Sequence, residues 1–288
     1  MTAALFVHHL VGRQITKDTD NDLRRGRDEK PLERVPGTDV EVIRWTSPAG
    51  DGACTVVWLP TDRLDTQVAS TEVTVTERKR AAGYTRESDR LLSLGSAWLT
   101  RRLVAISLNV SPLDAPIVRT CDRCARPHGR PVVWAATKDG ATVQVSATHS
   151  RGLVGVALST SGAVGLDVEN LQTRGPDAWS SVWRVLGRPP AAEDPESRPE
   201  SGPEAAHAAA TAWVRTEAVL KATGHGLAVS SRSVDITAGA GPRVIRWPWG
   251  DPTDRVSLFD LDPGPRYVAA LAVIHDETTD FTGLPRPA

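Results

Sequence analysis

The chain is constrained most by two short acidic stretches, about fifty residues apart, that have the periods of two different secondary structures. In residues 164–169, Val-Gly-Leu-Asp-Val-Glu, apolar and acidic side chains alternate. Successive side chains on a β-strand point to opposite faces, so Asp167 and Glu169 share one face while Leu166 and Val168 point into a core. The pattern predicts a strand that presents two carboxylates near its end, where functional sites are commonly built.

A second apolar run, residues 153–158, precedes this strand. The four residues between the two runs, Ser-Thr-Ser-Gly at 159–162, favour a reversal of the chain. The pattern predicts a β-hairpin in which the two runs pair with each other.

The second stretch, residues 213–221, is predicted to be helical. A start signal of Ser, Pro and Glu lies in residues 201–204, an alanine-rich segment follows, and Gly224 is a stop signal. Residues at intervals of four share one helix face. On this helix they are Trp213, Glu217 and Lys221. Because Glu followed by Lys at this spacing is also the ordinary arrangement of a surface ion pair, the helix alone leaves both interpretations open.

Together the two stretches resemble the signature of the Sfp-type 4′-phosphopantetheinyl transferases: a strand reading hydrophobic-Gly-hydrophobic-Asp-hydrophobic-Glu, then a helix reading Trp-x-x-Lys-Glu-Ala-x-x-Lys. Thr216 stands where the family has its first lysine. Three further segments are similar to family segments in the same order. They are residues 84–90 (a basic, aromatic-led helix start), residues 127–131 (Gly-Lys-Pro, with Arg130 for Lys) and Thr148-His149-Ser150 (Ser-His-Ser).

The resemblance implies an α/β (α+β) fold of two similar halves related by a pseudo-twofold axis, with coenzyme A bound in the cleft. It implies transfer of the 4′-phosphopantetheine arm of coenzyme A to a serine of an acyl or peptidyl carrier protein, with release of 3′,5′-ADP. The family members are metal-dependent, with Mg²⁺ expected here and Mn²⁺ as a substitute, and usually act as monomers.

The resemblance also assigns roles to residues of this chain. Magnesium prefers oxygen ligands, and its expected ligands are Asp167, Glu169 and Glu217. Glu217 is the candidate base, and Lys221 pairs with phosphate oxygens. The expected coenzyme A contacts are Lys221, Thr148, His149, Arg86 and Arg130, with the two arginines on the 3′-phosphate. The residues alone favour a different interpretation of His149, as a core or strand-end histidine with a satisfied hydrogen bond.

Two other classes of function stay open. A metal-dependent phosphohydrolase would use the same acids without any carrier protein. A non-catalytic carrier-binding homologue would keep the fold without turnover, and Thr216 is the motif change that favours it.

The number of cysteines and the net charge bear on whether the chain binds zinc or nucleic acid. Cys121 and Cys124 form a CxxC, but with His128 they supply three ligands where a closed zinc site needs four, so we expect two thiols in a connecting loop. Three cysteines in all indicate a reducing compartment. A formal net charge of −1 gives no global basic field for nucleic acid. Basic residues at 78–80 and 101–102 are predicted to form a local surface patch.

The remaining chain is predicted to contain a weakly ordered extension at 1–38, an N-terminal half at 39–160 and a C-terminal half at 161–288 with a mobile loop at 187–204. No segment has the length of a membrane span or the pattern of a signal peptide, so a cytoplasmic protein without membrane contact is expected. Helices are predicted at 74–80 and 88–104, and strands at 40–45, 54–59, 106–110, 132–135, 143–147, 233–237 and 267–274.

Overall fold

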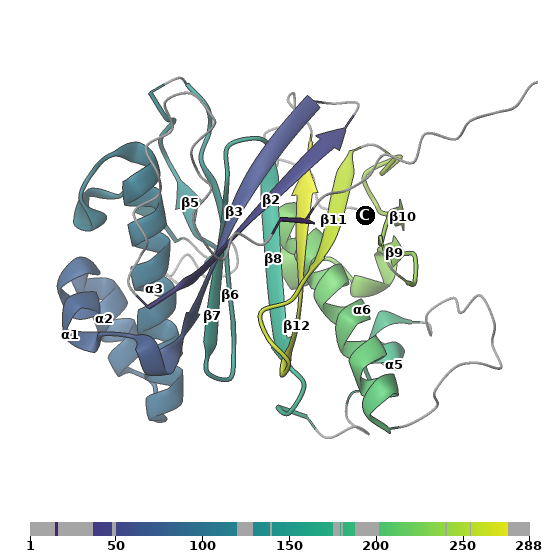
Figure 1. The fold of residues 1–288 in the computed structure, drawn as a ribbon, viewed down its shortest axis with the longest axis horizontal. Helices are drawn as coiled ribbons and strands as arrows, with labels where there is room; N and C mark the ends of the chain where they lie inside the picture. The colour runs from purple at the N-terminus through teal and green to yellow at the C-terminus, as the bar shows by residue number, and fades with distance from the viewer. Residues whose placement is uncertain are drawn as a thin grey trace, which may run out of the picture.

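The computed structural model describes residues 15–16, 37–47, 50–119, 129–138, 140–174, 179, 181–187, 202–239, 241–253 and 255–275. Within them the protein is an α+β structure, with antiparallel sheets at the centre and helices on the outside (Figure 1). The predicted CxxC segment, nearly all of the predicted N-terminal extension and most of the predicted loop 187–204 lie outside the described residues.

The first sheet has the order β1-β2-β3-β7-β6. Its strands are β1 (Ile15–Thr16), β2 (Asp39–Ser47), β3 (Gly50–Pro60), β6 (Gln144–Ser150) and β7 (Leu153–Ser159). Helix α3 (Glu87–Leu108) packs on this sheet, and α1 (Thr66–Glu72) and α2 (Val75–Ala82) pack on α3. The apolar face predicted for the long helix is confirmed, since Leu94, Trp98 and Leu99 are buried against Leu59, Val154 and Val156.

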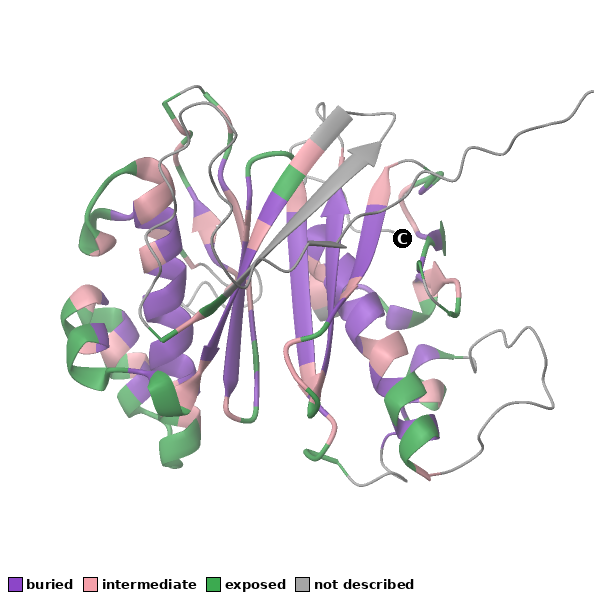
Figure 2. Cartoon of the chain, in the orientation of Figure 1, coloured by how far each residue is buried: buried purple, intermediate pink, exposed green. Residues whose placement is uncertain are grey.

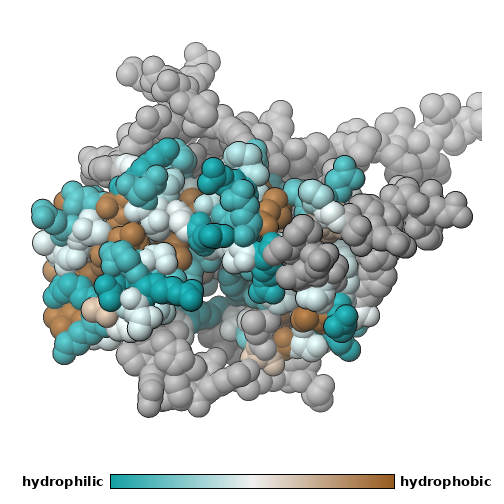
Figure 3. Space-filling model, turned by 90° about the horizontal axis from the view of Figure 1, so that it is seen from below, coloured by the Kyte–Doolittle hydropathy of each residue, from teal (hydrophilic) through white to brown (hydrophobic). Residues whose placement is uncertain are grey.

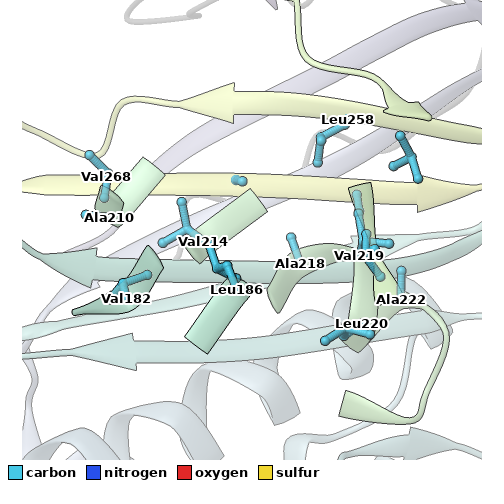
Figure 4. Packing of buried hydrophobic residues seen from close by; sticks show 14 of the residues in the cluster. Val182, Leu186, Ala210, Val214, Ala218, Val219, Leu220, Ala222, Leu258 and Val268 are labelled. Atoms are coloured by element: carbon cyan, nitrogen blue, oxygen red, sulfur yellow. The ribbon is translucent and has the colours of Figure 1, made fainter. Parts of the chain in front are cut away.

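The second sheet has the order β11-β12-β8 and is covered by α6. Its elements are β8 (Ala163–Asn170), β11 (Val256–Leu261), β12 (Tyr267–Ile274), α6 (Gly202–Ala222) and α5 (Val182–Leu186). Small residues on one side of α6, such as Ala210, Ala218 and Ala222, bring the helix close to the strands (Figure 4). The bounds of α6 confirm the predicted helix.

The inner faces of the two sheets bury a third apolar cluster between them. Val56, Trp58 and Ala157 come from the first sheet, and Leu166 and Leu271 from the second. The order of layers is helix, sheet, sheet, helix, with exposed residues concentrated on the outer sides of the helices (Figure 2). The first sheet uses only strands before residue 160 and the second only strands after residue 162.

The hairpin predicted at 153–169 is wrong. Strands β7 and β8 both form, but β7 pairs with β3 and β6 while β8 pairs with β12. The 160–162 turn therefore moves the chain from one sheet to the other. Besides its partner β12, strand β8 also lies beside β6. These two strands run parallel, because Ser146 contacts Leu166 and Ser150 contacts Asn170 at the same offset of 20 residues.

Three smaller predictions need correction. The strand predicted at 106–110 is the end of α3, which stops at Leu108 with Asn109 in the left-handed conformation. Arg101 was predicted to lie on the surface of that helix. It is buried instead, and it donates a hydrogen bond to Glu77 at 2.6 Å. Arg102 pairs with Glu72 at 2.6 Å, so neither arginine belongs to a free basic patch.

Helix α1 and strand β11 were not predicted from the sequence, whereas the strand predicted at 267–274 is confirmed, because β12 has the same bounds. Only Asp235–Ile236 of the predicted 233–237 strand is extended, as β9, paired with β10 (Val244–Arg246). Short β4 (Ile117–Val118) and β5 (Val132–Val133) form a separate pair. Four 3₁₀ turns connect these elements in the described ranges: η1 (Thr61–Arg63), η2 (Pro112–Asp114), η4 (Gly226–Ala228) and η5 (Ser231–Ser233).

Helix α3 is long and apolar enough, by length and composition, to cross a membrane. Of its most apolar window, 61% is buried inside the protein. Its buried residues pack on β3 and β7, which is the environment of a core helix.

At Gly165 the backbone of α6 lies directly against β8. A Cβ atom there would lie 1.9 Å from Ala218 O and 2.4 Å from Ala222 N, both backbone atoms of α6. Any side chain at residue 165 would therefore push the helix away from the strand.

We predict that Gly165→Ala lowers the free energy of unfolding by about 3 kcal/mol, because the backbone of α6 cannot yield as a flexible side chain would. The matched control is Gly95→Ala inside α3, where a new Cβ would meet side chains at 3.4 Å, an ordinary contact distance. Because Ala is the better helix former, this control should be neutral or stabilising by about 0.5 to 1 kcal/mol. Urea denaturation measures both variants, and equal effects would contradict the close approach of α6.

Candidate functional site

The two carboxylates of β8 lie beside β6, as the alternation of the strand predicts. Leu166 and Val168 point into the cluster between the sheets, while Asp167 and Glu169 lie on the other face. Thr148 Oγ1 donates to Asp167 Oδ1 at 3.1 Å, and Ser150 Oγ donates to Glu169 Oε2 at 3.0 Å. Each acid of β8 is thus held by a hydroxyl of β6.

Helix α6 brings its polar face to the same place. Lys221 Nζ donates to Asp167 Oδ1 at 2.6 Å, to Leu166 O at 3.1 Å and to Thr148 Oγ1 at 3.4 Å. Lys221 therefore forms its ion pair with Asp167 of β8 and not with Glu217, one turn earlier on α6. Among the described contacts, the surface Glu–Lys pair that the sequence left open is not found. Glu217 is buried, with 6% of its surface exposed.

The electrostatics of Glu217 show that it lies near both strand acids. Burial and then the negative charge of Asp167 raise the pKa of Glu217 to about 7, and Glu169 adds to the effect while Lys221 opposes it. Burial and the charge of Asp167 likewise raise the pKa of Glu169, against the Ser150 hydrogen bond. Three carboxylates and one ammonium therefore form a single coupled cluster, although their sequence positions span about fifty residues.

Two oxygen atoms of this cluster have the chemistry of cation ligands. Asp167 Oδ2 and Glu217 Oε1 are buried and have no hydrogen-bond partner in the part of the chain that the structure describes. A buried carboxylate oxygen without a partner is costly, and an oxygen-loving cation would satisfy it. In the same described residues, however, no three His, Cys, Asp or Glu side chains are already grouped as a complete metal site.

The structure brings some of the expected nucleotide contacts to this cluster and not others. Thr148 belongs to it directly. His149, next on β6, is exposed, yet the protein atoms packed around its ring and then the charge of Lys221 lower its pKa. Arg130 packs on Gly224, directly after α6. Arg86 is exposed at the start of α3, and the structure describes no contact between it and the acids.

Hydrophilic residues surround a hollow near the middle of the molecule when it is viewed from below (Figure 3). The ends of β6 and β8 point toward that side of the molecule (Figure 1). The strand ends that carry Ser150 and Glu169 thus lead to a hollowed polar face.

Ser146 was not singled out from the sequence, and Ser150 was named only as part of the Thr148-His149-Ser150 segment, without a role. Ser146 and Ser150 accept hydrogen bonds from the backbone N–H groups of Leu166 and Asn170, both at 3.0 Å. The available signal was the alternation of hydroxyls at 146, 148 and 150, which marks one face of β6. Thr216 is buried and its hydroxyl donates to Ala212 O within α6, so it does not replace the charge of a lysine.

Compared with known proteins, the chain matches no protein-family model, and no curated protein matches it. Inferences about function therefore depend on the site itself and on the motif resemblance.

We predict that Glu217→Gln stabilises the protein in a pH-dependent way. The folded-state pKa of Glu217, about 7, lies above its ordinary value of 4.5, so this residue costs stability as pH rises from below 4.5 to above 7. At pH 8 in EDTA the variant should be more stable by about 1 to 3 kcal/mol, and at pH 4.5 the difference should vanish. Chemical denaturation at both pH values measures it, and a constant difference would contradict the raised pKa.

Proposed function

We propose that this protein is a 4′-phosphopantetheinyl transferase that uses coenzyme A, with Mg²⁺ or Mn²⁺, to convert an apo acyl or peptidyl carrier protein to its holo form. The observation that supports this most is the meeting of Asp167 and Glu169 from β8 with Glu217 and Lys221 from α6. The two helix-covered sheets, one on each side of the 160–162 turn, support the two-half arrangement with a pseudo-twofold axis that the resemblance implies.

The metal would be held by Asp167, Glu169 and Glu217. Of these, Asp167 and Glu217 each have a buried oxygen atom with no described partner. When bound, Mg²⁺ supplies charge neutralisation of the pyrophosphate and of the leaving group. The ligand set contains only carboxylates, which suits Mg²⁺ or Mn²⁺ better than a thiolate-preferring metal.

In the proposed reaction the serine hydroxyl of the carrier attacks the β-phosphorus of coenzyme A. The new bond joins the serine oxygen to that phosphorus, the pyrophosphate P–O bond breaks, and 3′,5′-ADP leaves. Glu217 accepts the serine proton. Burial and the charge of Asp167 raise its pKa to about 7 without a cation, and a cation held beside it would lower that pKa, so Glu217 would be deprotonated near neutral pH.

The cationic side chains around the acids bind the nucleotide. Lys221, three residues before Gly224, places its ammonium between the acids of β8 and the end of α6, where it can pair with phosphate oxygens. Arg130, beside Gly224, extends the same positive region toward the 3′-phosphate, with Arg86 and His149 on the α3 side.

We predict that the purified protein, incubated with coenzyme A, Mg²⁺ and an apo carrier protein, adds the mass of phosphopantetheine to the carrier. Asp167→Asn and Glu217→Gln should each slow this transfer by at least about a hundredfold, since one removes a ligand and the other the proton acceptor. Intact-protein mass spectrometry measures the product.

The matched control is Glu204→Gln, which removes an exposed acid from the first turn of the same helix and should leave transfer unchanged. Transfer at the wild-type rate by both site variants would contradict the mechanism. Coenzyme A cleavage without any carrier would favour the phosphohydrolase. Binding of coenzyme A without transfer to several carriers would favour the non-catalytic homologue.

A further inference from the structure

Ser150 makes two different hydrogen bonds at the point where β6 meets β8. Its Oγ accepts the backbone N–H of Asn170 at 3.0 Å and donates to Glu169 Oε2 at 3.0 Å. The residue is buried, with 7% of its surface exposed. A hydroxyl can donate one bond and accept others, so both contacts are satisfied at once.

Ser146 provides a built-in comparison on the same strand. It lies on the same face of β6, is equally buried at 7%, and accepts the backbone N–H of Leu166 at the same 3.0 Å. No contact between Ser146 and a carboxylate is described. The two serines therefore share the role of joining the strand edges and differ in the bond to Glu169.

The hydrogen bond from Ser150 holds Glu169, which is the least buried of the three acids. Asp167 and Glu217 are each 6% exposed, whereas Glu169 is half-buried beside the end of β8. A flexible glutamate at a strand end loses side-chain entropy when it joins a shared site. A hydroxyl that already holds one carboxylate oxygen removes much of that cost and leaves Oε1 to face a ligand.

We infer that Ser150 is a positioning residue that preorganises Glu169 for divalent-cation binding. This inference rests on the proposed function, because it assigns Glu169 to the metal. Ser150 acts through Glu169 and makes no contact with the reacting atoms, so its effect falls on cation affinity.

The test is Mn²⁺ binding to the full chain at pH 8, measured by electron paramagnetic resonance of free Mn²⁺ and by calorimetry. Ser150→Ala should weaken binding by about ten- to a hundredfold, the usual effect of removing a group that orients a metal ligand. Ser146→Ala should change the affinity by less than about threefold, since the bond it loses does not reach a carboxylate. Denaturation in EDTA should show comparable losses of stability in the two variants.

The outcomes separate the two claims. If the wild-type protein binds no Mn²⁺ at millimolar concentration, the proposed metal site fails. If the wild type binds Mn²⁺ and Ser150→Ala binds it equally well, the positioning role is overturned while the metal site stands. Equal losses in Ser146→Ala and Ser150→Ala also overturn it, because they indicate strand placement alone. Should Ser150→Ala not fold, Ser150→Cys, with a weaker donor of similar shape, must show the same direction of change.

Discussion

The site depends on the way two sheet edges meet. Strands β6 and β8 lie side by side without a backbone ladder between them; the described contacts run from Ser146, Thr148 and Ser150 to the backbone and acids of β8. An edge strand otherwise leaves buried N–H groups unpaired or invites another chain to pair with it. Because hydroxyls both accept and donate, one face of β6 can do both jobs: Ser146 and Ser150 close this edge, and Thr148 and Ser150 orient the acids. A direct ladder would have satisfied the backbone but left the carboxylates without these partners.

The acidic cluster lowers the stability of the protein, and the anchoring of α6 explains how it is tolerated. Ionised Glu217 costs about 3 kcal/mol relative to an ordinary glutamate, given its pKa of about 7. The same helix buries Val214, Val219 and Leu220 in the apolar cluster under it, and each of them contributes about 1.5 to 3 kcal/mol. Arg215 also forms a two-point ion pair with Asp260 of β11, at 2.8 and 2.6 Å. These contacts outweigh the cost of ionised Glu217, so the helix keeps its charged residues beside the acids of β8.

The residue periodicity within single strands and helices made about half of the site predictable from the sequence. The shared face of Asp167 and Glu169 and the extent of α6 follow from alternation and helix signals within a few residues. The pairing of β7 with β8 was predicted wrongly because strand partners are chosen by distant segments, and a turn signal cannot tell a hairpin from a step between sheets. Arg101 was misplaced for the same reason, since its partner Glu77 lies 24 residues earlier on another helix. The hydroxyls of β6 were visible as a pattern, but their meaning required β8 beside them.

Gly165 explains why a strand motif and a helix motif can act as one unit. On β8, Gly165, Asp167 and Glu169 share a face, and the backbone of α6 rests directly on Gly165. That contact sets the height of α6 above the strand, and one turn of helix then places Lys221 within 3.1 Å of Leu166 O and 2.6 Å of Asp167 Oδ1. A larger residue would lift the helix by more than the tolerance of these hydrogen bonds. The glycine is therefore part of the acidic motif for a steric reason: the distance between the acids of β8 and the charged residues of α6 is fixed by a backbone-to-backbone contact.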